Sequence, residues 1–243
     1  MRRLVAWNLM TLDGYFEGRT PWDLAFHETV WGDELEAFSL EQGDAIGTLL
    51  FGRRTYEGMA KYWATETGAV ADMMNALEKA VATRTLEEAT WSNTRLLKGN
   101  AVAAVEALKA EDGKDVYVFG SADLLASLLP AGLVDEYRLC IAPVVLGGGT
   151  PLFRPQDRQL RMRLESARPL KTGGTILTYT AAVFANSGQA AGSVRPPGRT
   201  APGSRRPGSA SARSAPAGPA GSAPRPLPAP PARTASRRSP PGR

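Results

Sequence analysis

The stretch VYVFGSADLLASLLP, residues 116–130, carries the clearest structural signal in the chain. Four apolar, β-prone residues lead into a Gly-Ser turn, and the leucines that follow are spaced to share one face of a helix. Pro130 ends that helix, because proline cannot continue the backbone hydrogen-bond ladder. The stretch therefore predicts a strand, a tight turn and a helix in succession, which favours an α/β fold.

The same alternation of strands and helices extends outward from this unit. Toward the C-terminus the pattern changes, because two alternating segments follow each other without an intervening helix. We therefore predict a three-layer α/β domain with a mixed, mostly parallel sheet and an antiparallel C-terminal edge. The expected strands are residues 4–10, 45–51, 80–83, 94–97, 116–119, 136–141, 160–165 and 175–184, and the expected helices are residues 33–42, 53–62, 69–76, 101–112 and 122–129.

Residues 185–243 differ sharply in composition from the rest of the chain. They contain no Asp, Glu or Lys, but ten Arg and 13 of the 19 Pro, and their only aliphatic side chains larger than alanine are Val194 and Leu227. Such a segment cannot bury enough apolar surface to offset the entropy of ordering. We expect one folded domain, residues 1–184, followed by a disordered basic tail, residues 185–243.

The tail also dominates the charge of the chain. Without its ten arginines, the 29 basic residues fall to 19, against 24 acidic residues in residues 1–184. The sequence pI of about 9.5 is therefore a property of the tail, which has no aromatic residue to stack on a base. We expect no specific nucleic-acid binding, although non-specific contacts of the tail with RNA or acidic partners remain an alternative to a solvated appendix.

The N-terminus and the cysteine content limit the other classes of protein. Cys140 is the single cysteine, which excludes an intrachain disulfide and a cysteine-cluster metal site. The apolar run before Asn8 is too short for a secretion signal or a membrane span, so the expectation is a cytoplasmic protein without a membrane partner.

Three predicted strands end in groups suited to bind phosphate. Backbone N–H groups at a helix start favour an anion, and arginine adds charge-assisted contacts. In an open α/β sheet such strand ends meet at one edge, although each group alone is also compatible with an ordinary solvated turn. There is no GxGxxG or P-loop motif. The three groups are Gly52-Arg53-Arg54-Thr55, Thr83-Arg84 and Gly120-Ser121.

At these positions the sequence resembles the dihydrofolate reductase superfamily. Residues 49–57, LLFGRRTYE, are similar to the Gly-Arg-x-Thr-(Trp/Tyr)-Glu element of dihydrofolate reductases, and Thr83-Arg84 is similar to their Ser/Thr-Arg pair. Residues 8–15, NLMTLDGY, resemble the Ser-Leu-Asp-Gly opening of the reductase domain in bacterial bifunctional riboflavin-biosynthesis deaminase/reductases. Residues 118–124, 133–136 and 143–153 complete that pattern, so the resemblance spans about residues 2–184.

The resemblance implies that NADPH lies across the strand ends and that the protein is a homodimer. Its cofactor residues would be Gly52, Arg53, Arg54 and Thr55 at phosphate, Thr83 and Arg84 at the adenosine 2′-phosphate, and Gly120, Ser121, Ala122, Asp123 and Leu124 around the pyrophosphate. The chain departs from dihydrofolate reductases at Gly120-Ser121, where those enzymes have Gly-Gly. Among Asp23, Asp33 and Glu34, the sequence does not identify the carboxylate that holds the pterin in folate reductases.

The expected reaction is hydride transfer, which requires neither a metal nor a covalent nucleophile. Asp13, in the turn after the first strand, is the candidate to orient substrate or relay a proton. The lone His27 lacks triad partners, so a packing or surface role is favoured over general acid catalysis. The candidate substrate-binding residues are Asn8, Tyr15, Trp22 and Phe26.

The function predicted from the sequence is NADPH-dependent reduction of a small heterocyclic substrate. The reaction it most resembles is the 5-amino-6-(5-phosphoribosylamino)uracil reductase step of riboflavin biosynthesis. The alternatives are dihydrofolate reduction, a non-catalytic nucleotide-binding protein with the same fold, and a protein that acts through its tail.

Overall fold

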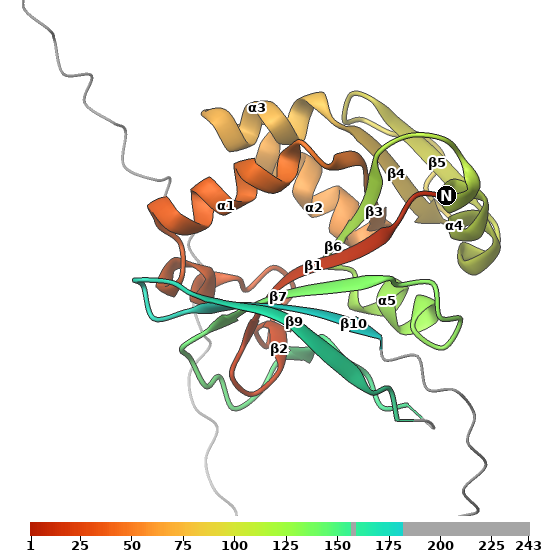
Figure 1. Ribbon diagram of the computed structural model, residues 1–243. Helices are drawn as coiled ribbons and strands as arrows, with labels where there is room; N and C mark the ends of the chain where they lie inside the picture. The colour runs from red at the N-terminus through yellow and green to blue at the C-terminus, as the bar shows by residue number, and fades with distance from the viewer. Residues whose placement is uncertain (157–158, 182–243) are drawn as a thin grey trace, which may run out of the picture. The chain divides into compact units, whose positions relative to one another are not determined.

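An eight-stranded sheet runs through residues 1–156 and 159–181, the part of the chain that the computed structural model describes (Figure 1). The first six strands in the spatial order are mutually parallel. The seventh pairs antiparallel with the sixth, and the eighth pairs antiparallel with the seventh. In that order the strands are β5 (Thr94–Lys98), β4 (Glu78–Thr83), β3 (Ile46–Gly52), β6 (Asp115–Phe119), β1 (Leu4–Thr11), β7 (Glu136–Ala142), β10 (Thr175–Ala181) and β9 (Met162–Pro169).

Helices cover both faces of the sheet. One face carries α1 (Asp33–Gly43), α2 (Arg53–Trp63) and α3 (Ala69–Ala76), and the other carries α4 (Ala101–Ala110) and α5 (Ala122–Leu128). Each face has its own apolar core, with Leu35, Tyr56 and Met74 in the first and Leu108 and Leu125 in the second. The structure thus confirms the predicted three-layer fold with a mostly parallel sheet and an antiparallel edge.

The centre of the sheet explains why the sequence signal is strong there. Leu4, Val5 and Ala6 of β1 are fully buried, and so are Val116 and Val118 of β6, which lies beside them. Strands covered on both faces are apolar over their whole length instead of alternating. Because β1, β3, β4 and β6 are parallel, their carboxyl ends lie on the same edge of the sheet.

Some elements differ from the sequence expectation. The short strands β2 (Tyr15–Glu17) and β8 (Thr150–Pro151) pair with each other, and a 3₁₀ helix, η1, covers Ala25–Thr29. None of these three elements was predicted. The two strands pair residues more than a hundred positions apart, and such a pairing leaves no local sequence pattern. Strand β9 covers Met162–Pro169, later than the predicted residues 160–165. Strand β10 is described as far as Ala181, and the predicted strand residues 182–184 lie outside the described part of the chain.

The predicted disorder of residues 185–243 and the predicted domain boundary at residue 184 lie outside the described residues. Within the described ranges, the helices are all too short or too polar to traverse a lipid bilayer. The same ranges hold no cluster of three His, Cys, Asp or Glu side chains arranged to bind a metal.

Candidate functional site

A cleft of about 1460 Å³ opens at the carboxyl ends of β1, β3, β4 and β6. It is larger than the roughly 300–1,000 Å³ of a common small-molecule pocket. All three predicted phosphate-binding turns line it, so Arg53, Arg84 and Ser121 share one cavity. The predicted cofactor residues on its wall are Gly52, Arg53, Arg54, Thr55, Thr83, Arg84, Gly120, Ser121, Ala122, Asp123 and Leu124.

The first turn connects β3 to α2. Gly52 stands at the N-cap of α2 in an extended conformation without a side-chain cap, so N–H groups of the first helical turn remain available to an anion. Arg53 pairs with Glu57 at 3.1 Å, one turn along the helix. Arg54 is exposed and has no hydrogen-bond or ion-pair partner among the described residues, which leaves its guanidinium free for a ligand.

The second turn, between β6 and α5, has an unusual backbone. Gly120 and Ser121 are both left-handed, with φ of +57° and +59°. A Cβ on Gly120 would lie 3.2 Å from Thr55 Cγ2, so the absence of a side chain lets this turn approach α2 closely. The Ser121 hydroxyl does not cap α5 but accepts a hydrogen bond from the Gly52 N–H at 2.8 Å. The left-handed backbone directs it sideways, so Ser121 joins the first turn to the second.

The third turn follows β4. The Thr83 hydroxyl accepts hydrogen bonds from the N–H groups of Thr85 and Leu86, at 3.2 and 2.9 Å, and so fixes the turn. Arg84 is exposed at its tip and, like Arg54, has no partner in the described part of the chain. The start of α4 also lines the cleft here, at residues 99–102, although sequence reasoning did not assign it to the site. Asn100 is the N-cap of α4, and its side chain accepts a hydrogen bond from the Ala103 N–H at 3.1 Å.

Asp13, the predicted catalytic residue, is not among the residues that line the cleft. Its carboxylate accepts hydrogen bonds from the Thr11 hydroxyl at 2.6 Å and from the N–H groups of Leu146 and Gly147 at 3.2 and 2.7 Å. These bonds, led by that from Thr11, lower the pKa of Asp13. The geometry gives Asp13 the task of fastening the β1–β2 turn to the loop that precedes β8.

The four predicted substrate residues divide into two pairs. Asn8 and Trp22 line the cleft, whereas Tyr15 and Phe26 do not. Tyr15 pairs with Pro151 in the small β2–β8 sheet, and Phe26 is 5% exposed in the core. The periodicity of η1 places His27 in the cleft instead of its neighbour, which sequence reasoning did not anticipate.

Trp22 crosses the cleft from the β2–η1 segment. It has a left-handed backbone, with φ of +65°, and its indole lies against Gly58 of α2. A Cβ on Gly58 would lie 1.6 Å from Trp22 Cζ2, so this contact requires glycine. The indole therefore forms part of the cleft wall against α2.

The carboxylates considered for pterin binding are outside the cleft. Neither Asp23, Asp33 nor Glu34 lines it, and Glu34 accepts a hydrogen bond from the Lys171 N–H at 2.6 Å. His27 of η1 lines the cleft instead. Burial lowers the pKa of His27 to about 4, so its imidazole is neutral at physiological pH.

Comparison with known proteins places this arrangement in a family. The model of the RibD C-terminal domain matches residues 2–176. The chain belongs to the RibD C-terminal domain family. Among its relatives is the uncharacterized protein YyaP of Bacillus subtilis (strain 168), 28% identical over 186 residues that cover 73% of this chain and 94% of YyaP. A second uncharacterized protein of that strain, YwjB, is 25% identical over 148 residues, 57% of this chain and 78% of YwjB.

Solved structures share the fold of this RibD C-terminal domain. A putative riboflavin biosynthesis protein from Shewanella sp. PV-4 aligns with a TM-score of 0.62 at 20% identity, over 74% of this chain and 99% of that one. Dihydrofolate reductase from Enterococcus faecalis, complexed with NADP(H) and RAB-propyl, aligns with a TM-score of 0.53 at 16% identity, over 74% of this chain and 96% of that one. RibD from Acinetobacter baumannii aligns with a TM-score of 0.56 at 15% identity, over 75% of this chain and 59% of RibD.

Proposed function

We propose that this RibD C-terminal domain protein is a reductase that uses NADPH to reduce a small heterocyclic substrate. The observation that carries the proposal is the convergence of three strand-end turns, from β3, β4 and β6, on one cleft. Two guanidinium groups in these turns, Arg54 and Arg84, have no partner within the described residues. Membership of the RibD C-terminal domain family supports the same activity.

The residues present fit the chemistry of a phosphorylated dinucleotide. The uncapped start of α2 and the left-handed pair Gly120-Ser121 offer backbone N–H groups close together, which suits a pyrophosphate. Arg84, at the end of β4, supplies a positive charge at a second position along the cleft, as a 2′-phosphate requires. We therefore expect NADPH to be preferred over NADH.

When bound, the nicotinamide supplies the hydride, so the protein has to bind, orient and shield. Ser121 holds the β6 turn against Gly52, which keeps the phosphate-binding groups in register. Trp22, which lies on the cleft wall against α2, would shield one side of the bound nicotinamide and substrate. Asp13 acts as a positioning residue, because its carboxylate holds residues 146 and 147 and does not face the cleft.

Folate reduction is a weaker candidate for this site. Folate reductases hold the pterin with a carboxylate on the first helix, but among the described residues no acidic side chain of α1 lines the cleft. The neutral imidazole of His27, which lines the cleft, suits an uncharged ring better than a protonated pterin.

The test is a thermal-shift and turnover experiment on the full chain. A ligand that binds the native state raises the melting temperature, so NADPH should raise it more than NADH at equal concentration. NADPH oxidation is then followed with pterins, ribosylaminopyrimidines and simple carbonyl compounds, with methotrexate as an inhibitor of folate-type activity. No thermal shift with NADPH contradicts the proposal, whereas a shift without any oxidation supports a non-catalytic nucleotide-binding protein.

We further propose that the protein forms a homodimer through strand β9. This strand is the edge of the sheet, and its Leu164 is 51% exposed. An edge strand presents unpaired backbone N–H and C=O groups, which can pair with the same strand of a second copy of the chain. Light scattering should give twice the chain mass for the wild type and the monomer mass for Leu164→Asp, and a monomeric wild type contradicts the proposal.

A further inference from the structure

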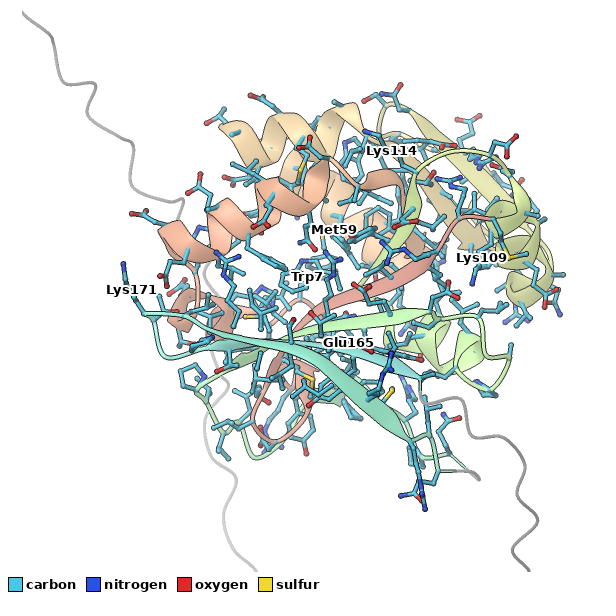
Figure 2. The ribbon with its side chains drawn as sticks, viewed as in Figure 1. Trp7, Met59, Lys109, Lys114, Glu165 and Lys171 are labelled. Carbon is cyan, nitrogen blue, oxygen red and sulfur yellow. The ribbon has the colours of Figure 1, made fainter. Side chains whose placement is uncertain are left out.

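The cleft has an apolar side, next to α1 and α3, that differs in character from the edge with the three turns. Trp7 and Leu9 of β1 face this side, whereas Asn8 between them faces α5, because successive side chains of a strand point to opposite faces of the sheet. Figure 2 labels two side chains of this wall, Trp7 and Met59, near the centre of the view. We call this part the apolar side of the cleft; besides Trp7, its members are Leu9, Met59, Trp63, Val70, Met73 and Phe119.

The apolar side keeps surface that the protein itself does not cover. All its members except Trp7 are only half-buried, although they pack against the core of that face of the sheet. Two more tryptophans on the cleft wall, Trp22 and Trp31, are 38% and 39% exposed. Single exposed apolar side chains are normal, but these share one concave wall, as the side chains of a small-molecule site do. The apolar side is therefore available for a ligand to cover.

Polar groups beside the apolar side already have partners within the protein. The Trp63 indole N–H donates to Met59 Sδ at 3.3 Å, so both atoms are used inside the wall. The Ser39 hydroxyl donates to a carbonyl of its own helix at 2.8 Å, and the Gln42 amide accepts from the Arg138 guanidinium at 3.2 Å. A ligand at this place therefore gains its binding free energy mainly from apolar contact.

The charged residues that line the cleft lie away from its apolar side. Within the described chain they come from the β2–η1 segment, the first two turns of α2, the end of β4 and the start of α5. Arg138 lies behind Gln42, does not line the cleft, and is paired with Glu136 at 2.5 Å. His27, which η1 contributes to the wall, is neutral at physiological pH because burial lowers its pKa to about 4. Since burying an unpaired charge is costly, a phosphate or carboxylate is excluded from the apolar side.

The types of side chain and the size of the cleft indicate the shape of the ligand. Tryptophan rings and methionine sulfur atoms make favourable contacts with flat aromatic rings. The cleft volume of about 1460 Å³ exceeds the roughly 300–1,000 Å³ of a pocket for one small molecule, so a second ligand fits beside a dinucleotide.

We propose that the substrate is an uncharged, flat, apolar system of at least two fused rings, which covers the apolar side of the cleft while NADPH occupies the edge with the three turns. This proposal rests on the proposed reductase function and narrows it. It excludes a substrate that carries a phosphorylated arm into this part of the cleft, as the phosphoribosyl pyrimidine implied by the sequence resemblance would. The selectivity comes from the lack of a cationic partner there as well as from apolar contact.

The experiment measures binding of three matched probes by calorimetry to the full chain, with and without saturating NADPH. The probes are 2-naphthol, which is uncharged and has two fused rings, phenol, which lacks the second ring, and 2-naphthyl phosphate, which adds a phosphate. With NADPH bound, we expect 2-naphthol to bind at least about tenfold more tightly than either of the others. Failure of 2-naphthol to bind, or equal or tighter binding of 2-naphthyl phosphate, overturns the proposal.

A charge placed on the apolar side tests its location. Val70 lies in the first turn of α3, half-buried on the cleft wall, and Val70→Glu should weaken binding of 2-naphthol at least about tenfold. Ala69→Glu is the matched control, because it adds the same charge one residue earlier at an exposed position that does not line the cleft. This control should bind 2-naphthol as the wild type does, and NADPH should bind both variants, which also reports that they are folded.

The outcomes separate the substrate class from the reductase function. Equal loss of 2-naphthol binding in Val70→Glu and Ala69→Glu, or no loss in either, overturns the proposal while NADPH binding to the wild type still supports a reductase. If Val70→Glu does not fold, the probe series on the wild type decides alone. Binding of 2-naphthol only in the absence of NADPH assigns the apolar side to the nicotinamide and also overturns the proposal. Absence of NADPH binding to the wild type instead refutes the reductase function, and the proposed substrate class with it.

Discussion

Replacing Arg84 with alanine should erode the preference for NADPH over NADH. Arg84 is exposed at the end of β4, on the wall of the cleft, and has no intramolecular partner in the described ranges, so its charge is available to the 2′-phosphate. A hydrogen bond to a charged group contributes about 1.5–3 kcal/mol, and solvent at this exposed site reduces it to about 1–2 kcal/mol. The dissociation constant for NADPH should therefore rise about five- to thirtyfold, while that for NADH, which lacks the phosphate, stays the same.

The assay is calorimetric titration of both cofactors into the wild type and two variants. Arg163→Ala is the matched control, because Arg163 is an exposed arginine on β9 that does not line the cleft. The ratio of the two dissociation constants cancels contacts shared by both cofactors. An equal loss of affinity for NADPH and NADH in Arg84→Ala refutes the assignment of the 2′-phosphate to Arg84. So does an Arg163→Ala variant whose preference for NADPH over NADH falls as much as that of Arg84→Ala.

Three further substitutions test the framework of the site. Ser121→Ala removes the acceptor of the Gly52 N–H and should lower the free energy of unfolding in urea by about 1–2 kcal/mol. Ser121→Gly loses the same hydrogen bond but relieves the left-handed backbone by about 1 kcal/mol, so it should be the more stable of the two variants. A glycine variant less stable than the alanine variant argues against this account. Burial lowers the pKa of Lys79 from 10.5 to about 8. Below pH 8 the folded protein carries a buried charge, which lowers the free energy of unfolding, and this loss of stability disappears as the pH rises from 8 toward 10.5. The wild type should gain about 2–3 kcal/mol over Lys79→Met between pH 7 and pH 10, and a difference independent of pH disproves the assignment. Burial lowers the pKa of His27 from 6.5 to about 4. The neutral ring therefore contributes its full stabilisation above pH 6.5, and this stabilisation is lost as the pH falls from 6.5 toward 4, where the unfolded chain binds a proton that the folded protein does not. Relative to His27→Leu, the wild type should lose about 2–3 kcal/mol between pH 7 and pH 4.5, and parallel unfolding curves would contradict the burial of that ring.

The sequence was sufficient to predict that three turns meet at one edge of the cleft. Each of its turns follows a buried parallel strand, and parallel strands bring their carboxyl ends together whatever lies between them in the chain. Gly52, Thr83 and Gly120 could thus be assigned to one edge from local patterns alone. The same reasoning applied to Asn100, whose helix begins at that edge and was predicted only as a helix.

The apolar side of the cleft, next to α1 and α3, could not be predicted in the same way. Its walls come from side chains of α1, α2 and α3, and a methionine on a helix has the same local pattern whether it fills a core or lines a cleft. The position of Phe26 and His27 depends on the rotation of a single 3₁₀ turn. The role of Asp13 depends on contacts with residues more than 130 positions away, which local sequence does not reveal.

The anchoring of Asp13 bears on how loss-of-function variants of this protein would behave. The loop that Asp13 holds accepts a hydrogen bond from Arg19, whose guanidinium lies over Gly148 at the mouth of the cleft. Releasing the loop would displace that arginine and slow turnover from a distance, although no ionisable group of the reaction had been removed. Asp13→Asn should therefore lower the turnover rate by weakening the attachment of this loop. The rate should fall by the same factor at every pH, and the shape of its pH profile should stay that of the wild type.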